Sequence, residues 1–171
     1  MDMEGKVMER RKFLKQSVLV SALVSTGSAL LPSLARAANV PGWPAKEFDA
    51  KVLDQAMHDS IGTTTVPESA AVHLTAPTIA ENGAAVPVTV DVDHPMTADN
   101  YIDAVFLYVD HNPTPLASAF FFSPENGRAY FQQRIKMAKT DMVRAVARTN
   151  KGELMGSKPQ EVKVTIGGCG G

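Results

Sequence analysis

The side chain most capable of covalent chemistry in this sequence is a cysteine close to the C-terminus. Cys169 is the only cysteine of the 171 residues, and the chain ends in the letters GGCGG. A thiolate attacks sulfur readily, so a cysteine can hold a sulfur-containing group through a covalent bond. Because a free cysteine is more often buried than displayed at a terminus, we interpret Cys169 as a reactive group.

Glycines surround this cysteine on both sides. Two precede it and two follow it, namely Gly167, Gly168, Gly170 and Gly171. Glycine has the widest backbone freedom and loses the most entropy when it is ordered, so the sequence predicts a flexible arm over residues 167–171. Three extended residues reach roughly 10 Å, which would carry the thiol into a narrow cleft of another protein. The alternative is a frayed terminus with an incidental cysteine.

The neighbours of Cys169 in the sequence do not activate it. The nearest residues carry no cationic side chain, and the C-terminal carboxylate is two residues away. A catalytic cysteine needs a neighbouring group that helps to form the thiolate, whereas a carrier can use such a group on the enzyme that receives it. The sequence therefore favours a carrier without a cofactor of its own, and not an enzyme.

The N-terminal residues have the pattern of an export signal. Arg10 and Arg11 precede a mildly apolar run over 18–31, and a small-residue motif ends at Ala37. We predict a twin-arginine signal peptide over 1–37 and a periplasmic location after cleavage. The apolar run of about 14 residues is shorter than the roughly 20 that span a bilayer, so we expect no membrane attachment in the cleaved protein.

Compartment and composition limit the possible functions. The periplasm is oxidising, and a lone cysteine there indicates either pairing between chains or a reactive thiol. The chain has 17 basic and 18 acidic residues and no basic stripe, which argues against nucleic-acid binding. Four histidines lie at no spacing typical of metal ligands, so we predict no metal site: His58, His73, His94 and His111.

The remainder of the chain predicts one folded domain. Residues 38–45 contain two prolines and read as a linker, and 46–166 form the domain. Within it, Phe48, Val52 and Ala56 recur at helical spacing and predict a helix over roughly 45–58, stopped by Gly62.

Beyond Gly62, short apolar runs alternate with turn residues, as in antiparallel strands that have one buried face. We predict an all-β, immunoglobulin-like antiparallel sandwich of about seven strands, with hairpin turns at 123–127 and 149–152. The predicted strands are 70–76, 84–92, 101–110, 115–123, 129–138, 141–150 and 160–167. The dense apolar runs 105–109 and 119–122 belong to the core of this sandwich or to a face that a partner covers.

Two stretches of the sequence resemble a known family. The ending VTIGGCGG over 164–171 and the segment 93–127, with its Asn112-Pro113-x-Pro115 pattern, are similar to SoxY, the sulfur-carrier subunit of the bacterial thiosulfate-oxidising (Sox) system. The resemblance implies a periplasmic immunoglobulin-like protein that forms a heterodimer with a second β-sandwich subunit, SoxZ. It also implies that Cys169 is the covalent attachment point for thiosulfonate and persulfide intermediates.

The same resemblance implies transient partners. A haem cytochrome joins thiosulfate to the cysteine, a hydrolase removes sulfate, and in many systems a molybdenum–haem sulfane dehydrogenase oxidises the remaining sulfur.

Two other interpretations of the function stay open. One is a structural subunit that forms an intermolecular disulfide. The other is a ubiquitin-like thiocarboxylate carrier, which an export signal disfavours because ATP-dependent activation is cytoplasmic.

Overall fold

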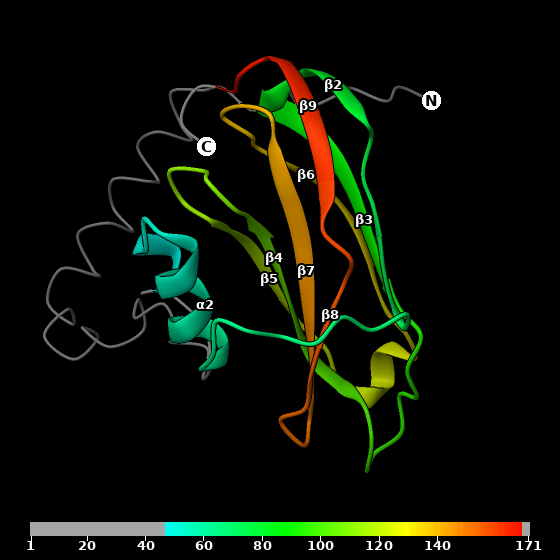
Figure 1. Cartoon of the computed structure of the whole chain (residues 1–171). Coiled ribbons are helices and arrows are strands. Elements are labelled where there is room, and N and C mark those ends of the chain that lie inside the picture. Colours follow the sequence, from blue (N-terminus) through cyan, green and yellow to red (C-terminus); the bar gives the residue numbers. More distant parts are fainter. Residues whose placement is uncertain (1–46, 169–171) are drawn as a thin grey trace, which may run out of the picture. The chain divides into compact units, whose positions relative to one another are not determined.

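The computed structural model describes residues 47–168 of the chain (Figure 1). The predicted signal peptide with Arg10 and Arg11 and the predicted linker over 38–45 lie outside the described residues. So do Cys169, Gly170 and Gly171.

Two β-sheets form the body of the domain (Figure 1). The smaller sheet has the order β1 (Val72–Thr75), β3 (Val86–Val92) and β6 (Ala129–Ile135). The larger sheet has the order β2 (Ile79–Asn82), β9 (Gln160–Ile166), β7 (Asp141–Thr149), β4 (Ile102–Val109) and β5 (Leu116–Phe121), and β8 (Leu154–Gly156) also pairs with β7. The predicted all-β sandwich is confirmed, with nine strands instead of about seven.

The core between the sheets follows from the alternation in the sequence. In β3, the four valines from Val86 to Val92 are buried, whereas Pro87 is exposed and Thr89 is partly exposed. The valines pack in one cluster with Val105, Leu107 and Val109 of β4 and with residues of β7. Period-two burial of this kind is typical of a strand with one face in the core.

Strand β4 is buried on both faces, which explains its continuous apolar run. Its residues Ala104, Phe106 and Tyr108 belong to a second cluster that includes Ala56 and Met57 of the helix α2 (Leu53–Ile61). The Ser60 hydroxyl lies 2.7 Å from that of Tyr108 and ties the helix to the sheet. The prediction that 105–109 is core is therefore confirmed.

The helix begins later than the sequence predicts. Residues Glu47–Asp49 form a short 3-10 turn (η2), and Val52 is extended, with φ −130° and ψ 140°, at the position before the helix. Gly62 ends the helix as predicted, since its φ of 78° is a left-handed conformation that glycine adopts without strain. Phe48 keeps its predicted place beside the helix cluster, but from the preceding turn.

The connections correct two further expectations. Residues 123–127 do not form a hairpin, because the 3-10 turn η4 (Pro124–Asn126) joins β5 of the larger sheet to β6 of the smaller one. The turn over 149–152 does join an antiparallel pair, β7 and β8. Strands β2 and β9 are parallel, so the larger sheet is mixed and not wholly antiparallel.

The second dense apolar run, 119–122, lies at the edge of the larger sheet. Phe120 stacks on Phe131 across the sandwich with ring centroids 3.9 Å apart, while Phe121 is 40% exposed. This run is thus divided between core and surface. Within residues 47–168, no helix is both long and apolar enough to cross a bilayer.

Candidate functional site

Strand β9 leads directly to the predicted reactive cysteine. The described chain ends at Gly168, one residue before Cys169, so the structure shows where the predicted arm leaves the body. We call Gly167 and Gly168 the arm base. The first half of β9 pairs antiparallel with β7, from Gln160 to Val162, and the second half pairs in parallel with β2.

The arm base is held by backbone hydrogen bonds. Gly168 is buried, and its N–H donates to the carbonyl oxygen of Met137 at 2.9 Å. The N–H of Met137 in turn donates to the carbonyl oxygen of Gly83 at 2.7 Å. Three segments far apart in the sequence therefore meet at this point: the end of β9, the β6–β7 loop (136–140) and the 3-10 turn η3 (Gly83–Ala85).

Close contacts explain why glycine occupies these positions. A Cβ added to Gly167 would lie 2.2 Å from the oxygen of Ala138, and one added to Gly168 would lie 2.7 Å from the oxygen of Gly83. A Cβ on Gly83 would lie 2.2 Å from the oxygen of Met137. Positive φ is found among the described glycines only at Gly62, Gly127 and Gly152, so the arm base needs glycine for space and not for an unusual backbone conformation.

This finding corrects part of the predicted arm. Residues 167–171 were expected to form a tether that does not pack against the body. Gly167 and Gly168 instead contact the backbone of two other segments. Cys169, Gly170 and Gly171 lie beyond the described residues, so their part of the prediction stays a prediction.

The turn beneath the arm base is shaped by its own residues. The side-chain oxygen of Asn82 accepts a hydrogen bond from the N–H of Ala84 at 2.8 Å and caps η3. Asn82 also pairs with Ile166 in the parallel ladder between β2 and β9. The short strand β2 thus places Gly83 next to the end of β9. The sequence did not reveal this strand, because four residues with little alternation carry almost no strand signal.

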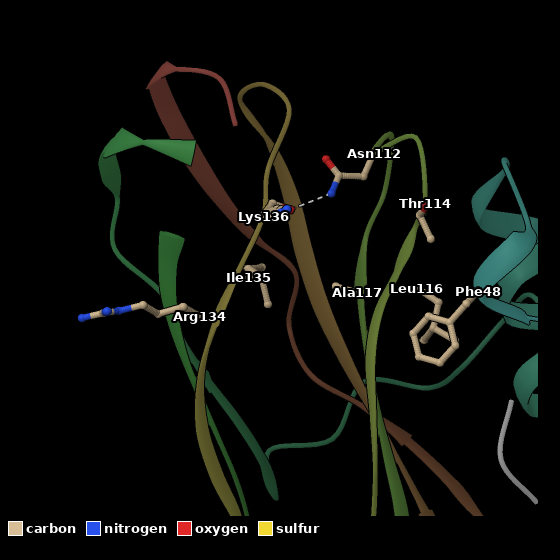
Figure 2. A pocket seen from close by; sticks show the side chains of 8 residues that line it. All are labelled: Phe48, Asn112, Thr114, Leu116, Ala117, Arg134, Ile135 and Lys136. Atoms are coloured by element: carbon tan, nitrogen blue, oxygen red, sulfur yellow. Dashed lines mark hydrogen bonds between the residues drawn. The ribbon is translucent and has the colours of Figure 1, made fainter. Parts of the chain in front are cut away.

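A buried asparagine fixes the β6–β7 loop from the other side. Asn112 is 3% exposed; its Nδ2 donates to the carbonyl oxygen of Lys136 at 2.7 Å, and its Oδ1 accepts from the N–H of Ala138 at 2.9 Å (Figure 2). The sequence pointed to Asn112 only as part of a proline-rich pattern and indicated no partner for it.

A hollow of about 290 Å³ lies beside Asn112. Its walls come from η2, from the β4–β5 loop (110–115) and from strands β5 and β6, and Figure 2 shows the Arg134 side chain extending away from the other side chains drawn. The residues that line it are Phe48, Asn112, Thr114, Leu116, Ala117, Arg134, Ile135 and Lys136.

Positive charge lies close to the arm base. Lys136 and Lys139 are exposed, and they flank the two residues that contact the arm base. Neither lysine belongs to an ion pair within the described part of the chain; the arginines that do are Arg128, Arg144 and Arg148. These cations are not apparent from the residues next to Cys169 in the sequence, because the loop lies about 30 residues away along the chain.

The histidines take separate positions in the fold. His111 donates its N–H to Asp141 at 2.7 Å, and its Nδ1 lies 2.8 Å from the same carboxylate, which is 3% exposed. His94 lies 3.3 Å from the side-chain oxygen of Asn100. Among residues 47–168, no three His, Asp or Glu side chains are grouped to hold a metal ion.

Fold and arm base together define the class of protein. It is a β-sandwich whose last strand is anchored on both sides and leads into a GGCGG ending. The family model for the sulfur oxidation protein SoxY matches residues 57–169, so the chain belongs to the SoxY family.

One solved structure agrees with this assignment. The sulfur carrier protein SoxY from Chlorobium limicola f thiosulfatophilum is 34% identical, with a TM-score of 0.54, over 67% of this chain and 96% of that chain. A superoxide reductase (neelaredoxin) from Ignicoccus hospitalis is 22% identical over 54% of this chain and 81% of its own, with a TM-score of 0.47. No curated protein matches the sequence.

Proposed function

We propose that this chain is a non-catalytic carrier that holds sulfur intermediates on Cys169 during thiosulfate oxidation. The observation that carries the proposal is the match to the SoxY family, which extends to the only cysteine of the chain. The similarity to a solved SoxY described as a sulfur carrier supports the same function. The GGCGG ending after an anchored strand suits a thiol that other proteins load and unload.

Loading is an oxidation. The Cys169 sulfur bonds to the outer sulfur of thiosulfate, the thiol proton goes to solvent, and two electrons pass one at a time through a partner haem cytochrome to its electron acceptors. The product is a cysteine thiosulfonate. Holding it covalently keeps a charged, reactive sulfur species at high local concentration for each enzyme that docks.

Unloading requires other partners. Water hydrolyses the thiosulfonate at its sulfone, releases sulfate and leaves a persulfide on Cys169. A sulfane dehydrogenase then removes six electrons from the outer sulfur while water supplies three oxygen atoms. The hydrolase releases the resulting sulfonate as a second sulfate and restores the thiol.

The proposal includes a location and a constant partner. We propose export by the twin-arginine route through Arg10 and Arg11, followed by cleavage near Ala37. In the periplasm the chain forms a heterodimer with a SoxZ-like β-sandwich subunit, and the enzymes dock on this complex weakly enough to exchange.

The test is the intact mass of the purified complex after incubation with thiosulfate and the partner cytochrome. The wild-type chain should gain one thiosulfonate-sized adduct, and a Cys169→Ser variant should gain none. An adduct on both proteins would place the carrier site elsewhere. A wild-type chain recovered only as a disulfide-linked dimer, without an adduct, would favour the structural alternative.

A further inference from the structure

We propose that Gly83 and Asn112 are positioning residues that clamp the base of the arm, so that the arm pivots after Gly168 and not at Gly167. The clamp consists of Gly83, Met137, Ala138 and the buried Gly168. Its effect on sulfur transfer rests on the proposed carrier function, whereas its geometry does not.

The clamp closes through two hydrogen bonds in series. Gly168 donates to Met137, and Met137 donates to Gly83. The contacts at Gly83, Gly167 and Gly168 leave no room for a methyl group on any of the three. Residues 167–168 therefore do not swing away without breaking the bond from Gly168 to Met137 and losing their close contacts with the β6–β7 loop and η3.

Two consecutive residues of the β4–β5 loop hold the two ends of the β6–β7 loop. Asn112 bonds to Lys136 and Ala138 at one end. His111 bonds through its N–H and its ring to Asp141, the residue that begins β7, at the other end. The β6–β7 loop, whose Met137 carbonyl accepts the hydrogen bond from Gly168, is therefore held in place by bonds that do not involve the arm.

An amide is the side chain that this brace requires. Asn112 donates to one backbone group and accepts from another, and both of its bonds are shielded from solvent. A carboxylate accepts but does not donate, and it would face the carbonyl oxygen of Lys136 with its own negative charge. Removing either bond leaves a backbone group of this loop without its Asn112 partner.

The clamp changes how the thiol is delivered. A pivot after Gly168 leaves one peptide unit before Cys169 in place of three, so the reach measured from the end of β9 is shorter than roughly 10 Å. An enzyme must then approach the face formed by η3 and the β6–β7 loop. The shorter reach has an advantage, because the thiol then starts from a defined position. Small errors in the position of a reacting group lower the reaction rate by large factors.

The clamp is tested by amide hydrogen exchange, which needs no sulfur chemistry. In the wild-type protein, we expect the Gly168 and Met137 amides to be protected. Gly83→Ala and Gly168→Ala should each lower this protection about tenfold or more. Gly170→Ala is the matched control, since it makes the same change on the other side of Cys169 and should leave both amides protected. Exchange of the wild-type Gly168 amide at the rate of a free peptide would overturn the clamp.

The brace is tested by Asn112→Asp. Asn150 provides a control because it also accepts from one backbone N–H, that of Tyr101, and donates to one carbonyl, that of Asp99. Asn112→Asp should lower the protection of the Gly168 amide, and Asn150→Asp should not. If neither substitution alters it while both proteins stay folded, Asn112 does not position the arm.

Transfer kinetics separate the clamp from the carrier function. With thiosulfate and the partner cytochrome, Gly83→Ala and Asn112→Asp should load Cys169 about tenfold more slowly than wild type. The reaction of the thiol with a small neutral methanethiosulfonate should stay within about twofold of the wild-type rate.

If wild type takes no sulfur on Cys169, the carrier function is wrong and the exchange result still stands. If loading succeeds but the Gly168 amide is unprotected, the clamp is wrong and the carrier function stands. Unchanged loading by both variants despite lost protection would show that the clamp does not serve transfer.

Discussion

At the scale of single residues, glycines of this chain are required for two different physical reasons. Gly62 adopts a left-handed conformation at the end of a helix. Gly167 and Gly168 do not adopt one, and the oxygen atoms of neighbouring residues exclude a side chain there. The letters of the sequence are identical in both cases, so only the contacts distinguish a flexible glycine from a closely packed one.

Asp141 is the residue on which the end of the β6–β7 loop depends. Its carboxylate accepts bonds from the N–H and ring of His111 and from the N–H of Met142, and it is almost fully buried. We predict that Asp141→Asn lowers the free energy of unfolding by about 1–3 kcal/mol, because one of these donors loses its acceptor. Urea unfolding would measure the change.

The control for this prediction is Asp91→Asn in β3. Asp91 pairs with Arg128, whose side chain is 66% exposed, and it raises the pKa of that arginine through hydrogen bonding and charge. An ion pair exposed to solvent contributes little to stability, so Asp91→Asn should lower the free energy of unfolding less than Asp141→Asn does. Equal losses for the two variants would show that the buried bonds of Asp141 carry no special weight.

At the scale of elements, helix α2 covers the outer face of β4. We predict that Met57→Ala, which removes a side chain that is 2% exposed, lowers the free energy of unfolding by about 2–3 kcal/mol. Val52→Ala, just before the helix, changes a side chain that is 60% exposed and should cost less than about 0.5 kcal/mol. Thermal or urea unfolding compares the two, and a similar cost for both would contradict the packing role of α2.

The elements that alternate most strongly were the ones that the sequence predicted. Strand β3 and the start of β9 were found because their valines recur with period two, and β4 because its apolar run is long. Strand β2 was missed, since its four residues show one buried position and its pairing with β9 depends on residues about 84 positions away. The clamp was missed for the same reason, because backbone contacts between distant segments leave no pattern in the sequence.

For the helix, the sequence pattern predicted more regular structure than the chain has. The spacing of Phe48, Val52 and Ala56 suggested one continuous helix. Phe48 reaches the same cluster from η2, and Val52 is exposed. Similar apolar spacing therefore arose from a turn followed by a helix, and the non-helical residues 50–52, with an extended backbone at Val52, separate the two elements.

At the scale of the whole molecule, charge is arranged around the arm base. Lys136 and Lys139 lie on the loop that receives it, and the intermediates proposed for Cys169 are anions. We predict that replacing both lysines by glutamate slows the reaction of the Cys169 thiol with an anionic aromatic disulfide about threefold or more at low salt, with little effect on a neutral methanethiosulfonate.

The control for the charge prediction reverses a lysine elsewhere. Lys151 lies in the turn after β7 and is exposed. Lys151→Glu should leave the ratio of the two reaction rates unchanged. Raising the salt concentration should reduce the difference between the double variant and wild type, and a difference that does not depend on salt would mean that the lysines act by another route.

The position of β9 within its sheet has a mechanical consequence. It is an inner strand: its first half bonds to β7, and its second half bonds in parallel to β2. A pull on the C-terminal tail would act along the axis of this strand. A load in this direction shears the hydrogen bonds to β7 and to β2 together and does not break them one after another. The domain should therefore stay folded when force is applied repeatedly to its C-terminal tail.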